Sequence, residues 1–470
     1  MKLKFNGSMA TFLVSTLHCI AISSSAATNK NTTNLEIEKD LLSGTESPIL
    51  IVVSYDGFRN EYFKRNVTPT MLKFRQEGIY TDRMLNVFPT KTFTNHFSIA
   101  TGLYPDAHGV LANSLYDTVD GPLDYSYKLF HYNNSIQPIW VVNEKANGVS
   151  GCMMWPGSNF NYSDTGCTYT LKYNSTLPLM ERVDTMIKWL TDPIKPANLV
   201  MFYSEQPDKL AHITGPDTKN ITEVVSALDL LTKYIQEQLI EHNLQNRTNV
   251  IHLSDHGMAG VPTARFINLT DYLEADSCKM YGSSPVLQIV PKEGKLEYVY
   301  QTLKNASKLN GHFDVYKSEE LPTRWHATNQ QRYGPIIAVA KINYGFQDLW
   351  EYAKDDGTSY GVHGYDNEEE LMHPIFMAKG PAFKSGGIQA KPFESVDLFH
   401  LFTKILGIND SLVTDGSTER ILQLLAAEES SESSYTLTIL IISICVLAII
   451  SGIIFYVMRV QRKKNYYSPT

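Results

Sequence analysis

Carboxylate and imidazole side chains recur at four separated places in the sequence, in combinations that suit a divalent-cation site. They are Asp56, Asp208 with His212, Asp255 with His256, and His363. His363 lies in a glycine-flanked segment, from Tyr360 to Asn367, in which a side chain can reach a site. Oxygen and imidazole nitrogen ligands together favour zinc or a similar divalent ion. Two such sets suggest a pair of ions about 3.5–4 Å apart, the arrangement used for in-line displacement at phosphorus.

A hydroxyl suited to attack phosphorus lies between Phe88 and His96. Thr92 precedes a stretch that ends at Gly102 and is typical of a short helix. The free backbone N–H groups at a helix N-terminus favour an anion such as phosphate. Because a threonine hydroxyl does not ionise by itself at neutral pH, a neighbouring metal ion would have to hold its alkoxide. Taken alone, a threonine at this position is more often an ordinary helix cap, so its assignment as a nucleophile depends on the acidic and imidazole residues converging on it.

Three short apolar runs end just before the acidic residues and predict buried strands. They cover Ile49–Val53, Leu199–Tyr203 and Val250–Leu253, and helical periodicity is present over Pro178–Leu190 and Thr222–Leu239. Strands alternating with helices predict an α/β fold, with a mostly parallel central sheet flanked by helices. Ligands of such sheets lie at the carboxyl ends of the strands, where all three acidic positions fall.

Both ends of the chain carry segments that do not belong to this body. Residues 1–26 have the basic, apolar and small-residue regions of a signal peptide. Residues 436–458 contain no charge and are long enough to cross a bilayer, and the basic residues that follow belong on the cytoplasmic side. We therefore expect a single-pass type I protein of the plasma membrane with its body outside the cell; a buried core helix at 436–458 is the alternative. The expected segments are a signal peptide (1–26), a flexible lead (27–47), a catalytic domain (48–408), a stalk (409–435), a transmembrane helix (436–458) and a cytoplasmic tail (459–470).

Composition and charge exclude several classes of protein. The 470 residues are 43% hydrophobic and 19% charged, as in globular proteins, and the formal net charge is −8. The two terminal segments hold basic but no acidic residues, so the body is more acidic still, which argues against binding a nucleic-acid duplex. One long apolar run excludes a polytopic transporter.

An extracellular body has consequences for its asparagines and cysteines. N-linked glycans are expected at Asn-x-Ser/Thr sites, which are Asn31, Asn66, Asn133, Asn161, Asn174, Asn220, Asn246, Asn268, Asn305 and Asn409. Three cysteines lie in the body, so one disulfide can form, most simply Cys152–Cys167, with Cys278 left over.

Seven short strings, in this order, resemble the ectonucleotide pyrophosphatase/phosphodiesterase (NPP) family of the alkaline phosphatase superfamily over roughly residues 48–408. They are Asp56-Gly57-Phe58-Arg59; Pro89-Thr90-Lys91-Thr92-Phe93 through Thr101-Gly102-Leu103-Tyr104-Pro105 and His108-Gly109; Trp155-Pro156-Gly157-Ser158; Pro207-Asp208 with His212 and Gly215-Pro216; Ser254-Asp255-His256-Gly257-Met258; His363-Gly364-Tyr365-Asp366-Asn367; and Gly380-Pro381-Ala382-Phe383. The length of the chain is similar to that of the short, membrane-anchored type I members, the fourth and fifth of the family in its usual numbering.

The resemblance implies a role for each matching residue. One zinc ion would be held by Asp208, His212 and His363, and the other by Asp56, Asp255, His256 and the Thr92 hydroxyl. Asn113, together with the Thr92 backbone N–H, would bind a phosphoryl oxygen. Phe93 and Tyr173 would clamp a nucleobase, and such an aromatic pair stacks on any base.

The implied activity is that of an extracellular two-zinc nucleotide pyrophosphatase/phosphodiesterase. It would cleave nucleotides such as NAD, ATP, ADP or dinucleoside polyphosphates through a nucleotidyl-threonine intermediate and release nucleoside 5′-monophosphates. The alternatives are a choline-phosphodiester or lysophospholipid phosphodiesterase, which would need a cage for a quaternary ammonium group, and an inactive cell-surface recognition protein, which would have lost a ligand. The sequence departs from the family's usual pattern at four positions: Thr94 replaces Pro, Asn159 replaces Asp, Gln206 replaces Glu and Ala211 replaces Gly. These departures concern substrate preference, because no implied metal ligand is lost.

Overall fold

An eight-stranded sheet forms the centre of the structure, a computed structural model that describes residues 47–327, 330–351, 359–409, 412–427 and 431–466. Neighbouring strands follow the order β19 (Ile388–Gln389), β2 (Ile79–Thr81), β18 (Phe376–Lys379), β9 (Thr248–Leu253), β1 (Ile49–Tyr55), β8 (Leu199–Ser204), β6 (Ser150–Met153) and β7 (Tyr169–Leu171). The three predicted strands are β1, β8 and β9, and they lie side by side in the middle of the sheet.

The centre of this sheet is parallel. Val52 of β1 is paired with Met201 of β8 on one side and with Ile251 of β9 on the other, both in parallel register. β6 is parallel to β8 and to β7, whereas β18 is antiparallel to β9 and to β2. The predicted mostly parallel sheet is therefore confirmed for its centre, and β18 makes the whole sheet mixed.

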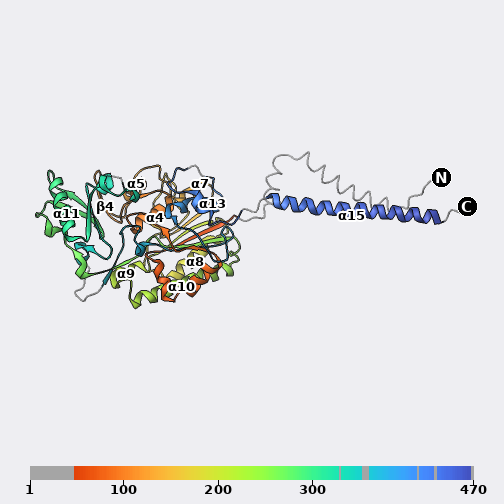
Figure 1. Ribbon diagram of the computed structural model, residues 1–470, viewed down its shortest axis with the longest axis horizontal. Helices are drawn as coiled ribbons and strands as arrows, with labels where there is room; N and C mark the ends of the chain where they lie inside the picture. The colour runs from red at the N-terminus through yellow and green to blue at the C-terminus, as the bar shows by residue number, and fades with distance from the viewer. Residues whose placement is uncertain (1–46, 328–329, 352–358, 410–411, 428–430, 467–470) are drawn as a thin grey trace.

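Helices cover both faces of the sheet. Successive side chains of a strand point to opposite faces, so alternate residues of β1 enter two separate cores. Leu50 and Val52 pack in one core with α4 (Thr92–Thr101), α7 (Ile139–Lys145) and α13 (Leu398–Ile405). Ile51 and Val53 pack in the other with α3 (Pro69–Glu77), α8 (Leu179–Leu190) and α10 (Lys219–Glu241). Figure 1 shows α4, α7 and α13 on one side of the sheet and α8 and α10, the two predicted helices, on the other.

A second, antiparallel sheet lies at the end of the domain away from the C-terminal helix (Figure 1), and the sequence analysis did not predict it. Its strands, in order, are β12 (Cys278–Ser283), β13 (Val286–Pro291), β15 (Ile336–Ala340) and β14 (Phe313–Lys317), and α11 (Leu296–Asn310) shares their core. This subdomain is inserted between β10 (Ala259–Pro262) and β17 (Ser359–Val362), which pair with each other. The edge strand β12 is only partly buried, so its sequence lacks the continuous apolar run that marks β1.

The remaining elements are short. They include α5 (Pro105–His108), α6 (Tyr127–Phe130), α9 (Asp208–Thr214), α12 (Gln330–Tyr333), η6 (Gln347–Glu351) and three two-stranded ribbons, β3 (Met84–Leu85) with β20 (Phe393–Glu394), β4 (Leu115–Asp117) with β5 (Gly121–Leu123), and β11 (Phe266–Ile267) with β16 (Gly345–Phe346). The expected Cys152–Cys167 disulfide is present, and Cys278 is a partly buried free thiol.

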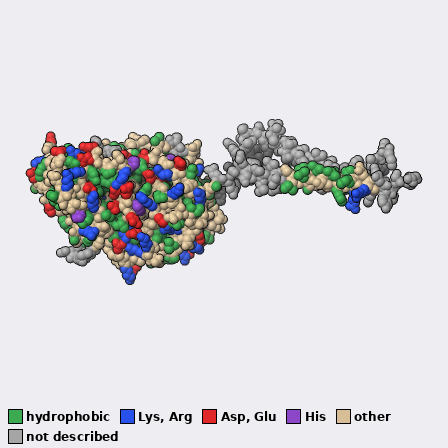
Figure 2. Space-filling model, in the orientation of Figure 1, with side chains coloured by type: hydrophobic (Ala, Val, Ile, Leu, Met, Phe, Trp, Pro, Cys, Tyr) green, Lys and Arg blue, Asp and Glu red, His purple; other side chains and the backbone are tan. Residues whose placement is uncertain are grey.

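The C-terminal helix α15 (Ser431–Tyr466) contains a stretch, Ile442–Arg462, that is long and apolar enough to span a bilayer, with a mean hydropathy of 2.2. None of this stretch is buried, so the alternative of a core helix is wrong. Figures 1 and 2 show α15 extending away from the domain, with apolar side chains along it and basic ones near its C-terminal end. The helix therefore fits a membrane anchor near the expected 436–458. The expected signal peptide and nearly all of the expected lead lie outside the described residues.

The folded domain continues beyond the expected boundary at 408. Ile421 and Leu424 are fully buried in the core that contains α13. The Ser417 N–H donates to Asp397 Oδ1 at 2.7 Å, and Arg420 Nε donates to Asp397 Oδ2 at 2.7 Å. The expectation of a stalk is therefore wrong for residues 412–427, which include α14 (Thr418–Leu422), because their few apolar side chains cover the core.

A chain that ends at residue 408 should be less stable than one that ends at residue 427. The shorter chain loses the side chains of Ile421 and Leu424 and exposes the core beneath them. In the full chain, Leu424→Ala alone should lower the free energy of unfolding by about 2–5 kcal/mol. Thermal unfolding measures these differences, and Leu422→Ala is the matched control because Leu422 is 48% exposed. Equal midpoints for the two truncated chains would show that α14 is not part of the domain.

Candidate active site

The carboxyl ends of the three central strands bring the predicted acidic residues together. Asp56 directly follows β1, Asp208 begins α9 after β8, and Asp255 lies just beyond β9. His256 Nε2 lies 3.2 Å from Asp56 Oδ1 and 3.0 Å from Asp255 Oδ2. These short distances follow from the parallel registers, which place the ends of β8, β1 and β9 at one edge.

Two histidines complete the cluster around Asp208. Its Oδ1 lies 3.3 Å from His212 Nε2, one turn further along α9, and 3.5 Å from His363 Nε2, just after β17. The His256 and His363 rings stack with centroids 3.6 Å apart. The structure thus brings all six predicted acidic and imidazole residues together.

The potential ligand atoms fall into two groups, in each of which they lie within 4.8 Å of one another. One group is Asp208, His256 and His363, and the other is Asp56, Asp255 and His256. The predicted ligand sets differ from these two groups in one respect. They combine His212 with Asp208 and His363, whereas in the structure His256 belongs to both groups. The assignment of these residues as metal ligands stays a prediction.

Each histidine of the cluster is oriented by a backbone carbonyl. The Nδ1 atoms face carbonyl oxygens at 2.7–2.9 Å: His212 faces Gly361, His363 faces Thr90, and His256 faces Gly257. A proton on Nδ1 satisfies each carbonyl and leaves the Nε2 lone pair directed into the cluster. Metal-bound histidines are commonly held by such an outer hydrogen bond.

The carboxylates of the cluster fit positively charged ligands. One oxygen of each is buried without a hydrogen-bond partner: Asp56 Oδ1, Asp208 Oδ1 and Asp255 Oδ2. Burial, together with the negative charges of Asp255 and Asp208, raises the pKa of Asp56 well above its ordinary value. Burial and the neighbouring His256 hold the pKa of His363 well below its ordinary value, so its ring is neutral, as a metal ligand requires. Divalent cations between these groups would offset the repulsion and occupy the open oxygens.

Two further side chains lie against the cluster, and the sequence did not predict them. The Tyr203 hydroxyl donates to Asp56 Oδ2 at 2.5 Å, and His96, whose Nδ1 is 2.8 Å from the Thr92 carbonyl, packs 3.3 Å from Asp255 Oδ2. His96 is fully buried, and its Nε2 is 2.9 Å from the Ser54 hydroxyl. Tyr203 ends a predicted strand and His96 lies one helical turn after Thr92, but neither position by itself indicates a partner.

Thr92 is the first residue of α4, and its side chain faces the cluster. Its Oγ1 lies 3.3 Å from His256 Nε2. The cap position before the helix is occupied by Lys91 and has no side-chain capping bond, so Thr92 is not an ordinary cap. The helix ends at Gly102 in the left-handed conformation, with φ of 68°, as its sequence predicted.

Asn113 lies beside the start of α4. Its Oδ1 accepts the Phe93 N–H at 3.0 Å, which satisfies one of the amide groups that a helix N-terminus leaves unpaired. The oxygen of the amide is thereby fixed, and the Nδ2 hydrogens are available for an acceptor near Thr92.

A cavity of about 650 Å³, here called the aromatic cavity, opens from Thr92 and Asn113. Phe93 and Tyr173, the predicted base clamp, both line it, and Tyr173 is 57% exposed. Tyr125 also lines it and packs edge-to-face on Phe93 with ring centroids 5.1 Å apart, a contact that was not predicted. The Tyr125 hydroxyl in turn donates to Asn159, one of the departures from the family pattern.

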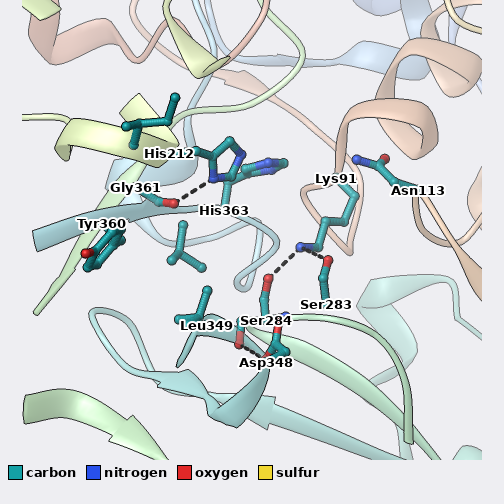
Figure 3. Close-up of a pocket in the computed structure, with 12 residues that line it drawn as sticks. Lys91, Asn113, His212, Ser283, Ser284, Asp348, Leu349, Tyr360, Gly361 and His363 are labelled. Carbon is teal, nitrogen blue, oxygen red and sulfur yellow. Dashed lines mark hydrogen bonds between the residues drawn. The ribbon is translucent and has the colours of Figure 1, made fainter. Parts of the chain in front are cut away.

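A second cavity of about 490 Å³ lies on the other side of Asn113 and His212, which line both cavities. Figure 3 shows Lys91 reaching into it between Asn113 and the turn that contains Ser283 and Ser284. Burial lowers the pKa of Lys91 to about 8. Lys91 lies within the second of the seven family-like strings, and the sequence predicted no role for it.

Fold and site together define an alkaline phosphatase-like arrangement, in which acidic and imidazole residues gather at the carboxyl edge of the sheet beside a hydroxyl at a helix start. A family model described as type I phosphodiesterase/nucleotide pyrophosphatase matches residues 50–366. The chain belongs to this family, which confirms the resemblance inferred from its sequence.

Relatives of known name agree with this assignment. The chain is 34% identical over 457 residues to bis(5′-adenosyl)-triphosphatase enpp4 of Xenopus laevis, covering 95% of this chain and 94% of that protein. It is 36% identical over 394 residues to human ectonucleotide pyrophosphatase/phosphodiesterase family member 5, covering 82% of this chain and 80% of that protein. A solved structure of the murine member 5, an inactive threonine-to-alanine variant in complex with AMP, matches with a TM-score of 0.75 and 36% identity over 81% of this chain and 100% of that one.

Tyr203→Phe should weaken zinc binding about 10–100-fold, the usual loss when an outer partner of a metal ligand is removed. The substitution deletes only the hydroxyl that donates to Asp56, so the fold should be retained. Isothermal titration of zinc into the metal-free protein measures the effect. Tyr234→Phe is the control, because the Tyr234 hydroxyl bonds Asp184 at 2.7 Å between α10 and α8. Unchanged zinc affinity in Tyr203→Phe would show that this bond does not support the site.

Proposed function

We propose that this chain is a two-zinc, extracellular nucleotide pyrophosphatase/phosphodiesterase that releases nucleoside 5′-monophosphates. The observation that carries the proposal is the convergence of six acidic and imidazole side chains on the Thr92 hydroxyl, which lies 3.3 Å from His256 Nε2. Membership of a phosphodiesterase/nucleotide pyrophosphatase family supports the same reaction class.

The residues that would hold the ions are those of the two groups, with His212 joining Asp208 and His363. Bound there, a pair of zinc ions would supply Lewis-acid stabilisation of negative charge on the phosphoryl oxygens and favour ionisation of the threonine hydroxyl. The carbonyl-bound histidines and the Tyr203 bond to Asp56 keep the ligand atoms in position before any substrate arrives.

Thr92 Oγ1 is the proposed nucleophile. Its oxygen forms a bond to the phosphorus next to the nucleoside, the bond from that phosphorus to the leaving group breaks, and the hydroxyl proton passes to solvent. The nucleoside monophosphate is then an ester of Thr92, and water cleaves this ester to restore the hydroxyl. Asn113 Nδ2 donates to a phosphoryl oxygen on which charge develops, since its Oδ1 is already engaged by Phe93.

The aromatic cavity would hold the nucleoside that stays with Thr92. Phe93 and Tyr173 offer faces for a base, and base stacking on aromatic side chains tolerates any base. AMP bound to the inactive murine relative supports a nucleotide ligand for the same site. The apolar helix α15 supports a membrane anchor, and we propose the type I orientation at the plasma membrane with N-linked glycans on the domain.

Thr92→Ala should lower turnover of a nucleotide phosphodiester at least about 10³-fold, as expected for loss of a nucleophile. Zinc stoichiometry should stay near two per chain, because the six acidic and imidazole ligands are retained. Turnover is measured with a nitrophenyl ester of thymidine 5′-phosphate, and zinc stoichiometry is measured by metal analysis of the same sample. Thr94→Ala, two residues along α4, is the matched control. Substantial turnover by Thr92→Ala would remove Thr92 as the nucleophile.

Removing the metal should destabilise the domain as well as abolish activity. Ligand binding to the folded state stabilises it by roughly 2.7 kcal/mol at a ligand concentration 100 times Kd, so zinc should raise the unfolding temperature of chelated protein. His363→Ala should reduce this rise and lower the zinc stoichiometry, whereas His242→Ala, on the exposed end of α10, should not. A chelated protein whose unfolding temperature does not respond to zinc would contradict the metal sites.

A substrate panel separates the remaining alternatives. The purified chain should hydrolyse nucleotide phosphodiesters faster than nitrophenyl phosphocholine. Faster cleavage of the choline ester would favour a choline-phosphodiester hydrolase. No hydrolysis of either compound with added zinc would favour an inactive recognition protein.

A further inference from the structure

The chain leaves the folded domain at one particular edge of the central sheet. Because β18 is antiparallel to β9, its last residue, Lys379, is paired with Val250, near the start of β9. Just after β18, the Ala382 N–H donates to Asn249 Oδ1 at 2.8 Å, and the Ala382 carbonyl accepts the Ala426 N–H at 2.9 Å. Ala426 therefore lies at the edge where β1, β8 and β9 begin, here called the amino edge.

The amino edge is opposite to the carboxyl edge, which carries the candidate active site. The amino ends of β1, β8 and β9 are in register, and their carboxyl ends lead to Asp56, Asp208 and Asp255. The seven residues of β1, Ile49–Tyr55, span about 20 Å at the rise of an extended strand. The site and the point where the chain leaves the domain are therefore separated by at least this length of sheet.

The connection from the domain to the helix that is proposed to anchor it is short. Residues 428–430 separate Ala427 from Ser431, the first residue of α15. Even a fully extended chain covers this interval in about 14 Å, and the helical residues before Ile442 add about 17 Å. Ala427 is therefore within about 31 Å of the apolar stretch that fits a membrane span.

A connection of this length does not let the domain turn over. A compact domain of the size of residues 47–427 is about 50 Å across. If the carboxyl edge faced the bilayer, most of this depth would lie between the bilayer and Ala427, which exceeds the reach of the connection. Figure 1 shows α15 leaving the domain on the side of α7 and α13, whereas α9, which carries Asp208 and His212, lies further from it.

The surface of the amino edge is mixed. Leu422, on α14, is 48% exposed, and Ile194, in the turn that leads into β8, is 86% exposed. Two of the expected glycan positions, Asn246 and Asn409, are exposed on the same edge. Scattered apolar side chains of this kind do not form a patch that binds a bilayer by itself, so the short connection has to set the orientation of the domain.

We propose, on the basis of the proposed membrane anchor, that the amino edge faces the outer leaflet of the bilayer and that the carboxyl edge opens to the aqueous phase. The connection between Ala427 and Ser431 holds this orientation. Thr92 and the two cavities then lie at least about 20 Å further from the bilayer than the amino edge. The site takes phosphate esters that are dissolved in the aqueous phase, and the phosphodiester of a lipid in the same bilayer does not reach it.

Energy transfer to the membrane surface tests the orientation. The full chain carrying Cys278→Ser and Cys445→Ser, which remove the free thiols of the described residues, is inserted into vesicles with acceptor dyes on lipid headgroups. A donor on Leu422→Cys, on α14, should lie at least about 20 Å closer to the acceptors than a donor on Ile213→Cys, on α9. Both side chains are exposed, so neither label enters the core. Equal heights or a reversed order would overturn the proposal.

A second pair of labels checks that the difference belongs to the whole domain. Ile194→Cys should give a height close to that of Leu422→Cys, because both lie on the amino edge. Leu309→Cys, which is 90% exposed on α11 of the antiparallel subdomain, should lie well above both. A label at position 309 that is no higher than the one at position 194 would contradict the proposal.

A spacer tests the connection itself. Forty glycine and serine residues inserted after Ala427 should reduce the height difference by at least half, because a flexible linker of this length averages about 35 Å between its ends. A difference that persists in full would show that the connection does not set the orientation, contrary to the proposal. If the unmodified chain does not float with the vesicles, the membrane anchor fails and this inference with it. If it floats and hydrolyses nucleotides but gives equal heights, only this inference fails.

Discussion

The concentration of negative charge at one edge of the central sheet is the constraint on which the rest of the site depends. Asp56, Asp208 and Asp255 follow three adjacent strands whose parallel registers bring their ends together. All three side chains are buried, and each presents an oxygen without a hydrogen-bond partner. Unpaired buried carboxylates are costly by several kcal/mol each, so the fold tolerates this edge only with compensating charge. The Tyr203 hydroxyl meets part of this requirement by donating to Asp56 Oδ2.

The backbone takes part in meeting this constraint. Gly57 follows Asp56 with φ of +68°, and a Cβ at this position would lie 2.9 Å from the Cβ of Asp208. The close approach lets the Asp208 N–H donate to the Asp56 carbonyl at 3.1 Å and the Gly57 N–H donate to Asp255 Oδ1 at 3.1 Å. A residue other than glycine would separate the carboxylates, so the Asp-Gly pair belongs to the geometry of the site as much as to the turn.

The sequence predicted the parts of this arrangement that depend on local patterns. Apolar runs located β1, β8 and β9, and the rule that strand ends meet at one edge was enough to place Asp56, Asp208 and Asp255 together. The contribution of Tyr203 to Asp56 and of Lys91 to the second cavity could not be predicted this way, because each depends on partners more than a hundred residues away. The antiparallel sheet was missed because its strands share no single pattern: β15 is a fully buried apolar run like β1, whereas the edge strand β12 is partly buried and lacks one. The end of the domain was misplaced because the polar residues around α14 conceal Ile421 and Leu424, whose burial only the folded core reveals.

The antiparallel subdomain contributes to the second cavity but not to the cluster of carboxylates and imidazoles. It is inserted after Asp255 and His256 and before His363, and the β10–β17 pairing holds the two ends of the insertion together beside the cluster. The positions of the carboxylates and imidazoles are therefore determined by the central sheet and this ribbon rather than by the insertion. Yet Ser283, Ser284 and Asp348, which come from the insertion, form the wall of the second cavity that faces the reactive centre. Arg332, also in the insertion, donates to Asp117 at 2.9 Å and to the Gly109 carbonyl at 2.8 Å, which ties this wall to the part of the domain that carries Asn113. Changes in the insertion can thus alter the walls of the second cavity without moving a carboxylate, so one arrangement of acidic side chains can be combined with differently shaped cavities.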